Sequence, residues 1–368
     1  MQTIWINSSI GKEKQVAGIE GEIERNMNSG KHTEKITNMI CPEIHYTETS
    51  RGIMITGCYG YVEKVILPDE IDGIKVTNLA PYTFAADRED VGEKIWYNPE
   101  TKETLNIEPG QKKEKLPRIA GTRLEDIWLP EYLTEVGRYA FYRCRNMQKI
   151  RLSNRLLDMG GGALTGCRLA EVEIDFEDGK KSCLKSIAEE MRYQLRVKLN
   201  YYGMNGERNV SGILFPEHYE EAVENTPARI LETHHHGAGG YYRQCFYNRE
   251  LDYRKYDEMF YHTVAEDTEE TAVELALNRL RYPIELSEQA RIVYTRYITA
   301  HMNAAAGWIV RKEDIEAIRF LEEEKLWTEE ALQEGMNLAG ENGKTEMFGI
   351  LMDVRKQLFE KKKKTFEL

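Results

Sequence analysis

The sequence predicts an α+β protein in which a short β-solenoid is followed by a mainly α-helical region. Between residues 124 and 176 a unit recurs at a spacing of 23 residues, which is typical of stacked repeats. Beyond about residue 216 the period of the apolar side chains changes from 2 to 3.6, and the latter is the period of an α-helix. A boundary between the two parts is therefore expected within residues 177–216.

Each repeat unit predicts a strand, a tight turn and a small apolar layer. Alternating side chains at Ile127 and Leu129 indicate a strand with every second residue inward, and Gly137 suits the bend that follows. A less regular copy runs from Val65 to Phe84. The clearest matches between the two best units are Leu129 with Leu152, Leu133 with Leu156, Gly137 with Gly160, Ala140-Phe141 with Ala163-Leu164, and Cys144 with Cys167.

These units resemble those of the BspA-type leucine-rich repeat family. A unit of that family begins with Ile-x-Leu-Pro, continues with a Leu or Val, then with Ile-Gly and Ala-Phe, and ends with a Cys. The resemblance covers about residues 44–176 and implies a short leucine-rich repeat β-solenoid that binds proteins or surfaces, in a family that is usually secreted. A short solenoid needs caps at its ends. We expect residues 51–62 to shield the N-terminal edge, and a helix beginning near Leu184 to shield the other.

The strand register also predicts which side chains face outward and form a partner-binding surface. An exposed Trp beside an Arg is a residue combination favoured at the centres of protein interfaces. Alternatively, Trp128 covers a gap against the inserted segment 87–123. The predicted partner-binding residues are Lys64, Ile66, Asp126, Trp128, Lys149, Arg151, Glu171 and Glu173.

The insertion at residues 87–123 is long enough to carry a function of its own. Its segments 94–98 and 103–107 flank a turn-like stretch, which predicts a projecting hairpin. Trp96 and Tyr97 in the first segment are either a contact surface or a local packing pair.

Helix caps and a second repeat characterise the C-terminal part. Asp267 with Glu270 is predicted as a capping box, and Ser287 and Thr328 are predicted as N-caps. Residues 315–322 and 345–352 align at a 30-residue shift, and the small-residue stretch before Asn342-Gly343 is similar to the second half of an ankyrin repeat. We therefore expect ankyrin-like helix pairs over about 287–356.

Four regions follow from these patterns. They are an N-terminal extension (1–43), a BspA-type leucine-rich repeat domain with a hairpin insertion (44–176, insertion 87–123), a connecting mixed region (177–265) and a helical ankyrin-like domain (266–368).

The segment around His234-His235-His236 is the main chemical alternative. These histidines with Cys245 or His262 are candidate metal ligands, and Cys245 with His236 is a candidate thiol dyad. Adjacent histidines point in different directions, however, and the usual ligand spacings are absent. We interpret the segment as a polar, glycine-rich interdomain loop followed by an aromatic strand, and expect neither a metal nor a cofactor.

Composition narrows the class of partner. The 368 residues carry 50 basic and 62 acidic side chains, a net charge of -12, which disfavours nonspecific binding to nucleic acid. No apolar run approaches the length of a membrane span, and the N-terminus lacks a signal pattern, so we expect a cytoplasmic chain with six reduced cysteines.

The predicted function is therefore a noncatalytic module that binds a protein or peptide on its strand face, without nucleic acid or membrane as partner and with an undetermined oligomeric state. Two alternatives stay open: a metal-dependent or thiol enzyme centred on residues 232–262, and a structural subunit of a homo-oligomeric assembly.

Overall fold

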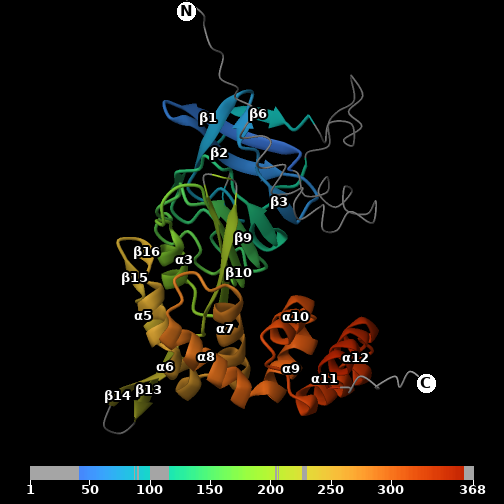
Figure 1. Cartoon of the computed structure of the whole chain (residues 1–368). Coiled ribbons are helices and arrows are strands. Elements are labelled where there is room, and N and C mark those ends of the chain that lie inside the picture. The colour runs from blue at the N-terminus through green and yellow to red at the C-terminus, as the bar shows by residue number, and fades with distance from the viewer. Residues whose placement is uncertain are drawn as a thin grey trace, which may run out of the picture.

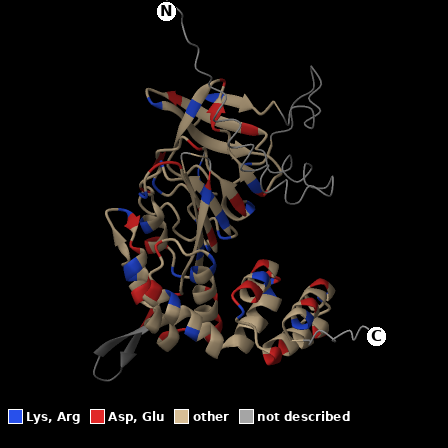
Figure 2. Ribbon diagram, viewed as in Figure 1, with Lys and Arg blue, Asp and Glu red and all other residues tan. Residues whose placement is uncertain are grey.

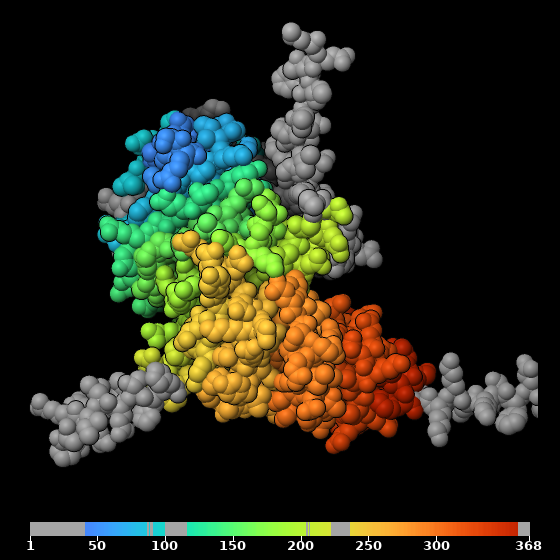
Figure 3. Space-filling model, turned by 60° about the vertical axis from the view of Figure 1, so that its left-hand side comes forward, coloured from blue at the N-terminus to red at the C-terminus, as the bar shows by residue number. Residues whose placement is uncertain are grey.

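The computed structural model describes residues 41–86, 88, 91–99, 116–203, 205, 207–225 and 230–359. Figure 1 shows an N-terminal sheet, then a stack of short strands, and then the helices at the other end of an elongated molecule. Figure 3 shows the same order on the surface, from the blue and green strands to the orange and red helices. The α+β solenoid predicted from the sequence is confirmed.

A mainly parallel sheet forms the spine of the solenoid. Its order is β12-β11-β10-β9-β7-β3, and only β12 runs antiparallel to its neighbour. Ile127, Ile150 and Val172 pair across adjacent strands and are all buried, so the predicted inward row is confirmed. The strands are β3 (Lys64–Ile66), β7 (Asp126–Trp128), β9 (Lys149–Ser153), β10 (Glu171–Phe176), β11 (Leu195–Tyr202) and β12 (Arg208–Phe215).

The second sheet lies at the N-terminal end. The strand expected within residues 51–62 forms as β2, between β1 and β5. The segment 94–98 forms β6, which pairs with β1, whereas 103–107 lies outside the described residues. Trp96 packs against the core, which agrees with local packing. The strands are β1 (Glu43–Thr49), β2 (Gly52–Tyr59), β4 (Glu70–Ile71), β5 (Ile74–Leu79), β6 (Lys94–Tyr97) and β8 (Glu135–Val136).

The predicted apolar layer stacks from one turn to the next. The rings of Phe84 and Phe141 are 5.3 Å apart and nearly parallel. The thiol of Cys144 donates to the carbonyl of Phe84, and that of Cys167 to the carbonyl of Phe141. Each cysteine therefore satisfies a backbone oxygen of the preceding turn while it packs in the core.

The helix expected near Leu184 forms as α3 (Leu184–Glu190), but it does not cap the sheet. Its residues Leu184, Ile187 and Ala188 are buried and continue the apolar layer, so α3 replaces the turn between β10 and β11. The parallel sheet thus runs on beyond residue 176. The end of the sheet is instead closed by antiparallel β12, against which helix α7 (Glu269–Arg281) packs.

The prediction that the chain becomes helical from about residue 216 is wrong for residues 219–236. A hairpin of β13 (Tyr219–Asn225) and β14 (Ile230–His236) comes first, and the first long helix is α7. The histidines lie on β14 and not in a loop, and a short helix separates them from the predicted aromatic strand, which is limited to Phe246 and Tyr247. The intervening elements are α4 (Gly239–Tyr242), β15 (Phe246–Tyr247), β16 (Glu250–Leu251), α5 (Tyr253–Glu258) and α6 (Phe260–Glu266).

The predicted caps Ser287 and Thr328 are confirmed, since each accepts a hydrogen bond from the amide three residues on. Helix α7, however, is capped by Thr268, because the carboxylate of Asp267 accepts the amide of Ala238 instead. The remaining helices are α8 (Glu288–Ala300), α9 (Met302–Lys312), α10 (Ile315–Glu323), α11 (Glu329–Glu341) and α12 (Thr345–Phe359). Among the described residues no helix has both the length and the hydrophobicity to span a membrane.

Candidate binding site on the strand face

The structure brings the eight predicted partner-binding residues onto one face of the parallel sheet. They form two neighbouring rows, because paired residues of adjacent parallel strands point to the same side. Across β3, β7, β9 and β10, the first row is Lys64, Asp126, Lys149 and Glu171, and the second is Ile66, Trp128, Arg151 and Glu173.

Opposite charges alternate along the first row. The Nζ of Lys64 lies 2.9 Å from a carboxylate oxygen of Asp126, and this hydrogen bond raises the pKa of the lysine. The Nζ of Lys149 lies 3.8 Å from Glu171 and 3.6 Å from Glu173. The row therefore contains two ion pairs, one between β3 and β7 and one between β9 and β10.

Glu173 is the buried centre of the second row. Its carboxylate accepts a hydrogen bond from Asn200 at 2.9 Å and lies 3.7 Å from the ammonium of Lys198. Burial alone would raise the pKa of Glu173, but the positive charges of Arg151 and Lys198 outweigh it, so the pKa is lowered. Glu173 is thus a carboxylate at neutral pH.

The predicted pair of Trp128 and Arg151 forms beside Glu173. The guanidinium of Arg151 lies 5.1 Å from the ring centroid of Trp128, and its Nε donates to Asp175 at 2.9 Å. The indole of Trp128 stays half-buried. Arg151 is therefore fixed by a carboxylate on one side and an aromatic ring on the other, so little side-chain entropy remains to be lost on binding.

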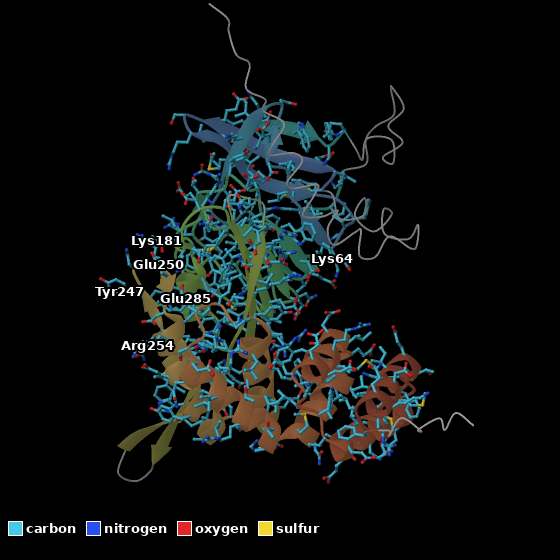
Figure 4. All side chains as sticks on the ribbon, viewed as in Figure 1. Lys64, Lys181, Tyr247, Glu250, Arg254 and Glu285 are labelled. Carbon is cyan, nitrogen blue, oxygen red and sulfur yellow. The ribbon has the colours of Figure 1, made fainter. Side chains whose placement is uncertain are left out.

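A cleft of about 540 Å³ opens on this face, between strands β9–β12 and helices α7 and α9. Its strand wall includes Lys149, Glu171 and Glu173, and its helical wall includes Glu274, Trp308 and Lys312. In Figure 4, Lys64 lies on the side of the sheet above the C-terminal helices, opposite Tyr247 and Arg254. The sequence did not predict the helical wall, because strand periodicity carries no information on where a following domain packs.

Comparison with known proteins agrees with the repeat geometry. Residues 118–205 match the BspA type leucine rich repeat region, in six copies. No curated protein and no solved structure matches the chain. The leucine-rich repeat match begins just before β7 and extends past β11, so it includes six of the eight strand-face residues. Lys64 and Ile66 lie on β3, which precedes it.

The alternative site, a metal or thiol centre within residues 232–262, does not bring its described histidines together. Each of them lies beside a neighbouring carboxylate instead. His236 stacks on Tyr219 and lies 3.3 Å from Glu221, and His262 lies 3.0 Å from Glu266. The side chains of His234 and His235 lie outside the described residues. In the part of the chain that the structure describes, no group of three His, Cys, Asp or Glu residues is placed to hold a metal.

Cys245 differs from an activated nucleophile. Its side chain is buried, and its thiol donates to the carbonyl of Tyr241. Burial raises the pKa of this thiol to about 12. Because the thiolate is the reactive form, Cys245 carries very little nucleophilic character at neutral pH.

Proposed function

We propose that the chain is a noncatalytic interaction module that binds a protein or peptide segment in the cleft on the strand face. The observation that carries this proposal is the alignment of outward side chains from four strands on one face, where β9 and β10 contribute Lys149, Glu171 and Glu173 to a cleft whose other wall is helical. Leucine-rich repeats generally mediate protein binding, and the family match over residues 118–205 supports the same role.

The charges on this face favour a segment that itself carries both signs. Lys149 and Glu171 are partly exposed, and their ion pair is 3.8 Å long. Such surface pairs contribute only about 0–1 kcal/mol, so a partner's Glu and Lys can replace them at little cost. Figure 2 shows basic and acidic positions interspersed over the strands and the helices. Trp128, on the neighbouring strand β7 of the same face, would supply an apolar anchor beside the cleft.

We also propose that the C-terminal helices are ankyrin-like pairs that support the cleft's second wall. Helix α11 packs against both α9 and α12. The turn between α11 and α12 contains Gly343 in a left-handed conformation, as the Asn-Gly pattern predicts.

Site-specific photo-cross-linking tests the proposed surface. A photoreactive residue at position 171 is expected to capture a partner from the source cell's lysate, whereas one at position 189, on α3, is expected not to. Glu189 forms a 3.7 Å pair with Lys185 on the surface, which makes it comparable to Glu171 with Lys149.

A pair of double variants then measures the contribution of the side chains. Lys149→Ala/Glu171→Ala is expected to reduce capture at position 128 several-fold, and the matched control Lys185→Ala/Glu189→Ala is expected to leave it unchanged. Equal capture by both variants would contradict the assignment. Arg151 is not a suitable target, because a glutamate there would face Glu173 and Asp175.

A further inference from the structure

A second charged surface lies at the corner where each turn leads into the next strand. Arg145 and Arg168 directly follow Cys144 and Cys167, which occupy equivalent positions in successive turns, and Arg192 follows the buried Met191. Arg143 belongs to the same corner, since its amide donates to the carbonyl of Thr165 in the next turn. We call Arg143, Arg145, Arg168 and Arg192 the arginine corner.

The arginine corner differs from the strand face in its charge balance. On the strand face, Lys64, Lys149 and Lys198 each make an ion pair with a carboxylate. In the described part of the chain, no carboxylate pairs with any of the four corner arginines, all of which are exposed. The carboxylates of the adjacent helix α3 are already engaged by Lys185 and by the amide of Leu164.

A buried guanidinium lies close to this corner and adds to its positive charge. Arg243 is only 7% exposed and donates to the carbonyls of Ala188, Met191 and Pro216, which are neutral acceptors. Burial and then repulsion by Arg192 lower the pKa of Arg243 to about 10, so it is still charged at neutral pH. No carboxylate among the described residues compensates this charge.

Aromatic rings hold two of the arginines in place. The guanidinium of Arg143 lies 5.0 Å from the ring centroid of Tyr142, and that of Arg168 lies 5.8 Å from Tyr193. A guanidinium stacked on a ring keeps its N–H edges free for a planar anion, and it binds carboxylates in a bidentate geometry. Tyr193 is half exposed and offers an apolar contact beside them.

We propose that the arginine corner binds a short acidic segment of another protein. Adjacent turns are about 4.8 Å apart, so three successive arginines span about 10 Å, a length suited to two or three neighbouring carboxylates. A long polyanion would meet the rest of a chain whose net charge is -12. This favours a short acidic peptide over a nucleic acid. The site is separate from the strand face and does not depend on its function.

Fluorescence anisotropy with a labelled octaglutamate peptide at low salt tests this proposal. The variant Arg145→Gln/Arg168→Gln/Arg192→Gln is expected to bind about tenfold more weakly than wild type, because three charge-assisted contacts are lost. The control Arg296→Gln/Arg319→Gln/Lys325→Gln removes the same number of exposed charges from helices α8 and α10 and the turn after α10, and it is expected to bind within about twofold of wild type.

Three results would overturn the proposal that the arginine corner binds an acidic segment. They are no binding by the wild-type chain, equal weakening in both triple variants, and tighter binding of labelled octathymidylate than of octaglutamate. The last would identify the corner as a nucleic-acid surface. The corner arginines make no ion pairs within the described chain, so their replacement is expected to leave the melting temperature unchanged and the comparison valid.

Discussion

Arg196 and Glu274 join the parallel sheet to the helical region. The guanidinium of Arg196, on β11, donates to both carboxylate oxygens of Glu274, on α7, with an Nη2–Oε2 distance of 2.9 Å. The indole N–H of Trp308, on α9, donates to the same carboxylate at 3.2 Å. One buried glutamate thus connects a strand and two helices at the end of the cleft.

Glu274→Gln is expected to lower the free energy of unfolding by about 2 kcal/mol, because it removes the buried carboxylate that pairs with the partly buried Arg196. The control is Glu270→Gln on the same helix, where the pair with Arg311 is exposed on both sides. That change should cost less than about 0.5 kcal/mol. Urea unfolding of the three proteins measures the difference, and equal costs would show that the junction contributes nothing beyond a surface pair.

The raised pKa of Glu131 predicts that the folded protein becomes less stable as the pH rises. Burial, with the nearby carboxylates of Glu177 and Asp69, raises the pKa of Glu131 to about 7, although Arg155 partly opposes this. The folded state then holds a proton that the unfolded state has already released, so raising the pH from 5 to 8 favours unfolding.

Glu131→Gln removes that titration. We expect the variant to be more stable than wild type at pH 8, by about 1 kcal/mol after allowance for solvent screening, and the advantage to shrink towards pH 5. Urea unfolding at intervals across this range measures it. A variant that parallels wild type at every pH would contradict the raised pKa.

Gly160 and Gly161 are adjacent but differ in the space around them. A Cβ at Gly160 would lie 2.4 Å from the carbonyl oxygen of Val136 and 2.6 Å from the amide nitrogen of Arg138, both backbone atoms of the preceding turn. A Cβ at Gly161 meets no atom within 4 Å. We expect Gly160→Ala to cost about 3 kcal/mol and Gly161→Ala to be neutral or slightly stabilising, as thermal melts would record.

The six cysteines are expected to resist thiol reagents in the native protein. All six are free and buried, and burial raises the pKa of the Cys144, Cys183 and Cys245 thiols to about 12. A chromogenic disulfide at pH 8 should label none of them until denaturant is added, and then all six. Rapid labelling of Cys245 alone in the native protein would instead support the alternative that the chain is a thiol enzyme.

The sequence predicted the strand face because two simple rules determine it. A spacing of 23 residues aligns the units, and the period-2 alternation separates Ile127 inside from Trp128 outside. The predicted helix near Leu184 also formed, but its role differed, since a solenoid turn can be helical as long as it supplies the buried layer.

Long-range contacts explain what the sequence did not predict. Thr268 caps α7 because Asp267 binds an amide 29 residues earlier, and no local pattern reports that contact. The strands β13 and β14 carry polar residues such as Glu220 and His236, so they lack the apolar alternation that indicates a strand. One signal of the helical wall was present: Glu274 is a charged residue between the apolar Val273 and Leu275, both of which are buried.

The reversed direction of β12 determines how this repeat array can change in length. Because β12 runs against β11 and helix α7 lies on it, no further parallel strand can be added at that end. A new 23-residue unit can enter only between existing turns, which moves the N-terminal sheet outward by one strand spacing. Gain or loss of repeats would therefore lengthen or shorten the strand face while the cleft beside α7 and α9 stays the same.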